Sequence, residues 1–221
     1  MGELGAALSK EALLQWRSRS RVVAIVVFGS SALLLFSFAI GPDTSALSRH
    51  APGFLWLALL LSSTLSLSES FRAETDERAL EGLLLLPARS HALFYGKAIA
   101  NGLQLALLGI ALLAPMVVLY DAPLPRPWAL IGVILLGSAG LAAPGTLYAA
   151  MTSQLRADQT LLPLLLFPLV VPVLLASVKA SSLLMHGDAM GQVGSWQMLL
   201  VAFDVIYWSL CGVLFERVVE D

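Results

Sequence analysis

Residues Leu93–Tyr120 read LFYGKAIANGLQLALLGIALLAPMVVLY, an apolar run that contains a single charged side chain, Lys97. About 20 apolar residues suffice for a helix to cross the hydrocarbon core of a bilayer. The apolar residues do not alternate with polar ones and the run is too long for a barrel strand, so a strand is excluded. The stretch predicts a transmembrane helix that tilts or extends into water.

The rest of the chain has the same character. Of its 221 residues, 58% are hydrophobic and 13% charged, with a mean hydropathy of +0.83, whereas soluble domains average about 45–50% apolar and about 25% charged residues. Backbone polar groups in lipid must be satisfied inside helices or a closed barrel. We therefore predict an all-α integral membrane protein forming one domain over 1–221, with six transmembrane helices: Val22–Ile40, Phe54–Leu67, Leu93–Tyr120, Trp128–Met151, Leu161–Val178 and Trp196–Phe215.

Lysine and arginine are distributed unevenly between the two sides of these spans. Cytoplasmic segments of membrane proteins carry an excess of these residues, and a cytoplasmic N-terminus places ten inside and three outside. Both termini are therefore predicted to be cytoplasmic. The inside set is Lys10, Arg17, Arg19, Arg21, Arg72, Arg78, Arg89, Lys97, Arg156 and Arg217, and the outside set is Arg49, Arg126 and Lys179.

The N-terminal segment, residues 1–21, has a helical pattern of its own. Leu8, Ala12 and Trp16 recur at intervals of four, with basic residues mostly on the other side. This pattern predicts a helix that lies in the membrane interface. A solvated extension that only carries the positive charge is the alternative.

A polar segment, residues 70–87, separates the second and third spans on the cytoplasmic side. Glu74, Glu77 and Glu81 fall on one helical stripe, and Leu80 and Leu83 belong to an apolar stripe beside it. Anionic lipid would repel the acidic stripe, so we expect a short helix that docks on a partner protein. A solvated loop is the alternative.

Polar and helix-breaking residues interrupt three of the predicted spans. Prolines remove a backbone donor and clash with the preceding turn. We therefore expect kinks at Pro144 in the fourth span and at Pro163, Pro168 and Pro172 in the fifth. The fifth helix is expected to be buried in protein, where its freed carbonyls can find partners. Asp204 lies near the middle of the sixth span, where a carboxylate costs about 2.5–3.5 kcal/mol. It is expected to face the bundle interior or a partner chain. An architectural role, protonated or paired with a hydroxyl of Ser62–Thr64, is equally open.

Several kinds of chemistry have no sequence support. Gly96-Lys97 is followed by Ala98, so the chain has no P-loop and any ATP must bind a separate subunit. Gly137–Gly140 has no base within reach for a serine protease, because His50, His91 and His186 are all assigned to loops. We therefore predict no catalytic residue, no metal site, no directly bound cofactor and no nucleic-acid partner. His50 and His186, on the predicted outer side, are interpreted as solvated loop residues.

Several motifs resemble the CcmB family, the haem exporter protein B of bacterial cytochrome c maturation. The most specific is Leu80–Pro87, LEGLLLLP. The others are Gly41-Pro42, Ala51–Trp56, Phe71-Arg72, Leu162-Pro163, Pro172, Phe203-Asp204 and Phe215–Asp221.

The resemblance implies an ABC-2-type permease of the bacterial inner membrane, with haem as a possible cargo. It implies as partners two CcmA-type ATPase subunits, a second copy of the chain, and CcmC, CcmD and CcmE-type maturation proteins. The segment between the second and third spans would be the coupling helix on the ATPase. Its matching residues are Phe71, Arg72, Glu74, Leu80, Glu81, Leu83 and Pro87, with Glu77 on the same acidic stripe.

Two functions follow as hypotheses for a non-catalytic subunit. The first is haem handling in c-type cytochrome biogenesis, where ATP hydrolysis by the partner releases haem-loaded chaperone or exports haem. The alternative is an ABC-2 permease for another amphipathic substrate, such as a lipid, a glycan or a drug. The transported species and the complex stoichiometry stay open.

Overall fold

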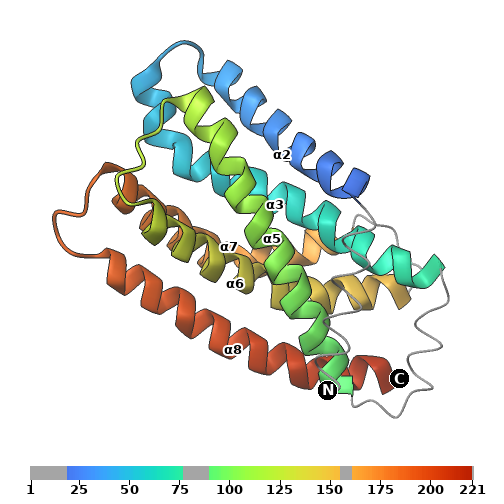
Figure 1. Ribbon diagram of the computed structural model, residues 1–221. Helices are drawn as coiled ribbons and strands as arrows, with labels where there is room; N and C mark the ends of the chain where they lie inside the picture. The colour runs from blue at the N-terminus through green and yellow to red at the C-terminus, as the bar shows by residue number, and fades with distance from the viewer. Residues whose placement is uncertain (1–18, 77–89, 155–160, 221) are drawn as a thin grey trace.

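The computed structural model describes residues 19–76, 90–154 and 161–220, and these residues form six long helices (Figure 1). Their bounds are α2 Arg19–Ile40, α3 Thr44–Asp76, α5 Ser90–Tyr120, α6 Pro127–Gln154, α7 Leu161–His186 and α8 Val193–Glu220. Each of the six contains a stretch that is long and apolar enough to cross a bilayer. The predicted all-α architecture with six membrane spans is confirmed. The predicted interfacial helix over 1–21 lies almost entirely outside the described residues.

The second and fifth spans extend furthest beyond their predicted bounds. The second span covers Thr44–Ser68 instead of beginning at Phe54, and the fifth continues to His186 instead of ending at Val178. Arg49, His50 and Pro52 resemble loop residues, but the helix passes through all three. His50, His91 and His186 were assigned to loops; this is wrong, because His50 lies in α3, His91 in the first turn of α5, and His186 is the last residue of α7.

The turn between α2 and α3 explains why the second span starts so early. Gly41 has a φ of +83°, a value that suits glycine, and its N–H donates to the carbonyl of Ser37 (3.1 Å), which ends α2. Asp43 then accepts hydrogen bonds from the N–H groups of Ser45 (3.0 Å) and Ala46 (3.1 Å). This N-cap begins α3 at Thr44, so only three residues separate α3 from the end of α2 at Ile40.

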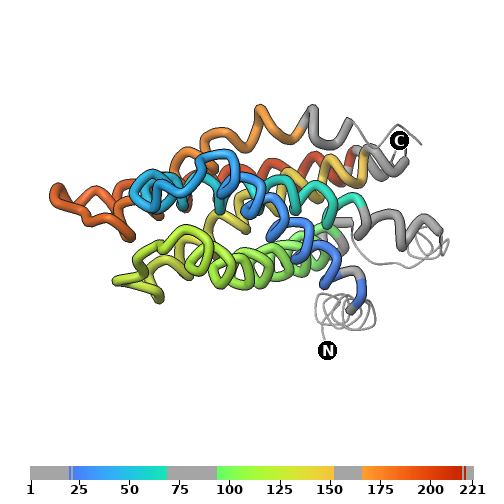
Figure 2. The backbone as a smooth tube through the Cα atoms, turned by 90° about the horizontal axis from the view of Figure 1, so that it is seen from above, coloured from blue at the N-terminus to red at the C-terminus, as the bar shows by residue number. Residues whose placement is uncertain are grey.

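The helices form a bundle in which α6 is central. This helix packs against α3, α5, α7 and α8, whereas α2 packs against α3 and α5 and lies at the margin. Figure 2 shows the bundle from above, with α2 on its outside. The short connections after α2, α5 and α7 gather at one end, and the other ends of the helices lie opposite (Figure 1). The bundle therefore has two distinct faces at the two sides of the membrane.

Candidate functional site

The predicted coupling segment is described only in part. Phe71, Arg72 and Glu74 lie in the last turns of α3, which continues beyond the end of the second span at Ser68 to Asp76. The first part of the segment therefore extends the second-span helix instead of forming a separate short one. Five other residues assigned to the segment lie outside the described residues: Glu77, Leu80, Glu81, Leu83 and Pro87.

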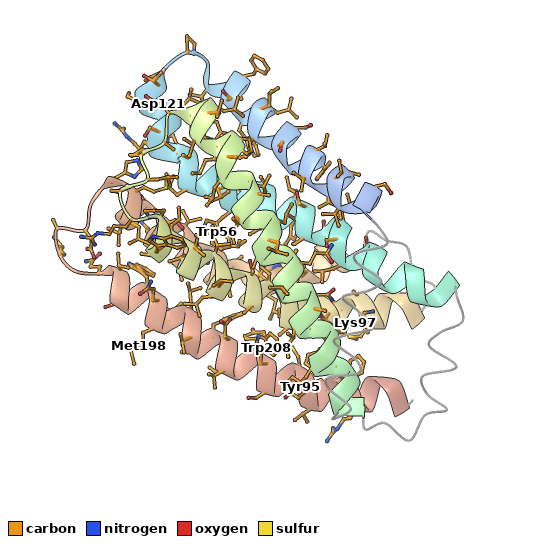
Figure 3. All side chains as sticks on the ribbon, viewed as in Figure 1. Trp56, Tyr95, Lys97, Asp121, Met198 and Trp208 are labelled. Atoms are coloured by element: carbon orange, nitrogen blue, oxygen red, sulfur yellow. The ribbon has the colours of Figure 1, made fainter. Side chains whose placement is uncertain are left out.

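The first helix after this segment, α5, is joined to α8 through aromatic rings. The rings of Tyr95 and Trp208 stack with centroids 6.3 Å apart (Figure 3), and those of Phe94 and Phe215 lie 5.2 Å apart. The Tyr95 hydroxyl donates to the backbone carbonyl of Trp208 (3.4 Å). A Cβ on Gly212 would lie 2.5 Å from that hydroxyl oxygen, so the glycine is what allows this approach. The start of α5 is thus in direct contact with α8.

Small residues on α6 let neighbouring helices approach its backbone. A Cβ on Gly137 would lie 2.2 Å from the Trp56 ring and 2.6 Å from Ser177 Oγ. The Trp56 indole, 1% exposed, lies in the middle of the bundle (Figure 3) and donates to Ser181 Oγ (3.0 Å). The segment Gly137–Gly140, considered above as a protease motif, is in the structure a packing surface for α3, α7 and α8.

Asp204 lies against this surface from the side of α8. Its Oδ1 is buried without a hydrogen-bond partner in the described part of the chain, 2.9 Å from where a Cβ on Gly140 would be. The predicted position toward the bundle interior is therefore correct. One turn further along α8, the Trp208 indole donates to the carbonyl of Ala139 (3.1 Å). Two successive turns of α8 thus contact adjacent residues of α6.

Pairing of Asp204 with the Ser62–Thr64 hydroxyls is not observed. Ser63 and Thr64 donate to carbonyls of their own helix, at Leu60 (2.7 Å) and Leu61 (2.8 Å). Among the described residues, α3 and α8 are not in contact. The alternative that these hydroxyls satisfy the carboxyl is wrong.

Polar side chains also join α5 to α3 and α6 within the membrane. Asn101 donates to Thr146 Oγ1 (3.0 Å), and Gln104 donates to Ser66 Oγ (2.9 Å). Lys97, counted above only as a cytoplasmic charge, is 7% exposed near the start of the third span. Sequence reasoning missed these contacts because each residue is a single polar position in an apolar run, and its partner lies at least 38 residues away.

The exposure of two prolines in α7 differs from that predicted. Pro163 is the third residue of α7, and residue 159, whose carbonyl would lose its helical donor, lies outside the described residues, so the interruption at Pro163 stays a prediction. Pro168 and Pro172 lie inside α7, but both are exposed, so the expected burial within this chain is wrong. Pro144 lies inside α6, as predicted, and its ring is buried.

The two outer histidines have different surroundings. Both ring nitrogens of His186 contact backbone carbonyls, Nδ1 that of Ser182 and Nε2 that of Ser48, each at 3.1 Å. His50 is exposed, and its ring lies 6.1 Å from that of Phe54. His186 therefore joins α7 to α3, whereas the ring of His50 is exposed.

Carboxylates cap the first turns of two helices at the end of the bundle where the short connections gather. Hydrogen bonds from Ser45 and Ala46 hold the pKa of Asp43 below its ordinary value of 3.8. Asp188 accepts from the N–H groups of Val193 (2.9 Å) and Gln192 (2.8 Å), and these bonds lower its pKa in the same way. Both groups lie outside the membrane spans. Negative charge is therefore fixed where α3 and α8 enter the bilayer.

The comparisons with known proteins indicate a single family over nearly the whole chain. The family model described as CcmB protein matches residues 3–217. The chain is 35% identical over 178 residues to heme exporter protein B of Haemophilus influenzae, covering 80% of this chain and 79% of that protein. It is 32% identical over 181 residues to the protein of the same name from Pseudomonas aeruginosa, covering 81% of each. With that from Paracoccus denitrificans it shares 38% over 148 residues, covering 66% and 67%.

Proposed function

The chain belongs to the CcmB family, and on that premise we propose that it is the membrane permease subunit of an ABC transporter that handles haem for c-type cytochrome biogenesis. The observation that carries this proposal is the family match over residues 3–217, together with relatives named heme exporter protein B. Six membrane-spanning helices fit a multi-pass protein of the bacterial inner membrane. The chain itself is not an enzyme in this proposal, and haem is cargo.

ATP hydrolysis takes place on a separate CcmA-type ATPase that docks on residues 70–87. The position of this segment supports the assignment, because α3 continues for two helical turns beyond its membrane span and α5 starts at Ser90 at the same end of the bundle. The acidic stripe of Glu74, Glu77 and Glu81 faces the ATPase. Tyr95 and Trp208 then pass the motion of α5 on to α8.

Both termini are cytoplasmic in this proposal. The distribution of ten basic residues against three supports this orientation. The end of the bundle that carries Gly41, Asp121 and Gly187 then faces outward. Of the outer basic residues, Arg49 and Arg126 lie near that end, close enough to lower the pKa of Asp43 and Asp188 respectively.

A second copy of the chain covers the exposed face of α7. Pro168, Val171, Pro172 and Leu175 share that face and are exposed in the single chain. The two prolines leave the carbonyls of residues 164 and 168 without their helical donors, and such groups are tolerated at membrane depth only where protein or water meets them. A lipid-facing position would leave them unsatisfied.

Purification from the native membrane tests this assignment. The chain, carrying an affinity tag and coexpressed with a second, differently tagged copy, is extracted in mild detergent. We expect a P-loop ATPase, the second copy and CcmC, CcmD and CcmE-type proteins to copurify, with a haem absorption band in the complex. Copurification with the ATPase of a lipid or glycan exporter, and no haem, would overturn the proposal.

A further inference from the structure

We propose that Asp204 is uncharged and donates its proton to the backbone carbonyl of Gly140, which Pro144 leaves without a helical donor. In a helix, the carbonyl of one residue accepts from the N–H four residues later. Pro144 has no N–H, so Gly140 is the residue deprived of its donor. The carboxyl of Asp204 packs against that same glycine.

The unpaired oxygen of Asp204 supports a neutral carboxyl. Oδ1 is buried and accepts no hydrogen bond, and no ion pair joins Asp204 to a basic residue in the part of the chain that the structure describes. An ionised carboxylate in the middle of a span would need either kind of partner. A protonated carboxyl instead needs an acceptor, and the carbonyl of Gly140 supplies one.

The same device is visible elsewhere in this chain. Pro52 lies inside α3 and deprives the carbonyl of Ser48 of its helical donor. His186, from α7, places its Nε2 3.1 Å from that carbonyl, and the tautomer that carries its proton on Nε2 donates to it. A titratable side chain from a neighbouring helix thus satisfies a carbonyl freed by proline at the outer end, as we infer for Asp204 at the centre.

Trp208 completes the contact between α8 and α6. Its indole donates to the carbonyl of Ala139, the residue before Gly140. Together Asp204 and Trp208 hold one turn of α6 in the form that Pro144 imposes. They are positioning residues for the central helix, and this positioning role in transport rests on the proposed function, whereas the hydrogen bond itself does not.

A double-mutant cycle tests the hydrogen bond. Pro144→Ala restores the missing N–H. Asp204→Leu should therefore lower the folding equilibrium constant, measured by SDS titration, about threefold less in the Pro144→Ala chain than in the natural one, as expected for an average interhelical hydrogen bond in a membrane. Asp204→Asn keeps a donor and should behave as the natural chain. The pair His186→Leu and Pro52→Ala should show the same coupling. Equal losses in both Pro144 backgrounds would overturn the proposal.

Infrared spectroscopy gives a second test that does not depend on folding of the proline variant. The natural protein at neutral pH should show a protonated-carboxyl band that Asp204→Asn removes and that Ser209→Ala, a matched change on α8, leaves in place. Persistence of the band in Asp204→Asn would overturn the proposal.

In cells, Asp204→Asn should preserve the yield of c-type cytochromes and Asp204→Leu should lower it. Equal yields would overturn the positioning role. A strain without the chain tests the proposed function separately.

Discussion

At the scale of single residues, Gly137 is the described glycine at which an added Cβ would come closest to a neighbouring side chain. A methyl group at this position would lie 2.2 Å from the Trp56 ring and 2.6 Å from Ser177 Oγ. The Trp56 ring cannot withdraw easily, because its indole is held by a hydrogen bond to Ser181. The glycine is therefore required by packing and not by a backbone angle.

Gly137→Ala should destabilise the protein by about 1–3 kcal/mol, the usual cost of overpacking a filled core. The matched control is Gly132→Ala on the same helix, where a methyl group would meet nothing within 4 Å. Alanine also favours the helix over glycine, so the control should be neutral or slightly stabilising. Unfolding midpoints of the purified variants in SDS measure both, and equal midpoints would contradict the packing described above.

The outer caps predict a specific dependence on pH. A carboxyl whose pKa is lowered by folding stabilises the fold above its unfolded value, 3.8, and loses that contribution as the pH falls through its folded value. The stability difference between the natural chain and the Asp43→Asn, Asp188→Asn variant should therefore be constant from neutral pH down to about 3.8 and shrink below it. A difference that already shrinks near neutrality would contradict the caps.

At the scale of elements, apolar runs predicted the number and order of the helices, because 20 or so apolar residues have no other stable place than a bilayer. Their bounds were less predictable. Pro52 and His50 looked like the end of a loop, yet α3 continues through them because Asp43 caps its start and His186 meets the carbonyl that Pro52 frees. Such compensation depends on another helix, which no local pattern reveals.

The candidate site was predictable to a similar degree. The position of Asp204 followed from the cost of a carboxylate in lipid, but its neighbour Gly140 did not, since glycine gives no signal of what approaches it. Contacts between Tyr95 and Trp208 likewise join residues 113 positions apart. Of the coupling segment, the structure describes only the helical end of α3, so docking of residues 77–87 is still a prediction.

Glu81→Lys should weaken association with the ATPase by reversing one charge on the acidic stripe, and Leu80→Asp should do so by disrupting the apolar stripe. Neither residue belongs to a span predicted from the sequence, so membrane abundance should be unchanged. Arg217→Glu, a charge reversal at an exposed residue of α8, is the control and should copurify the ATPase normally. Normal association in both variants would return the segment to a solvated loop.

At the scale of the whole molecule, the alternation of six helices fixes which connections share a side of the membrane. Reporter fusions after Ala122 and Met190, in the connections that follow α5 and α7, should report outside. Fusions after Thr75 and at Asp221 should report inside. Ser181 is unsuitable as an outer site, because it is buried within α7. Reversal of all four signals would contradict the orientation, and reversal of one would remove a span.

The central claim is that this chain serves haem handling for c-type cytochromes, and the most direct measurement is the haem content of those cytochromes in a strain that lacks it. Covalently bound haem in c-type cytochromes should disappear, b-type cytochromes in the same membranes should be unaffected, and a restored copy of the chain should recover the signal. Normal c-type cytochrome in the strain without the chain would contradict the claim.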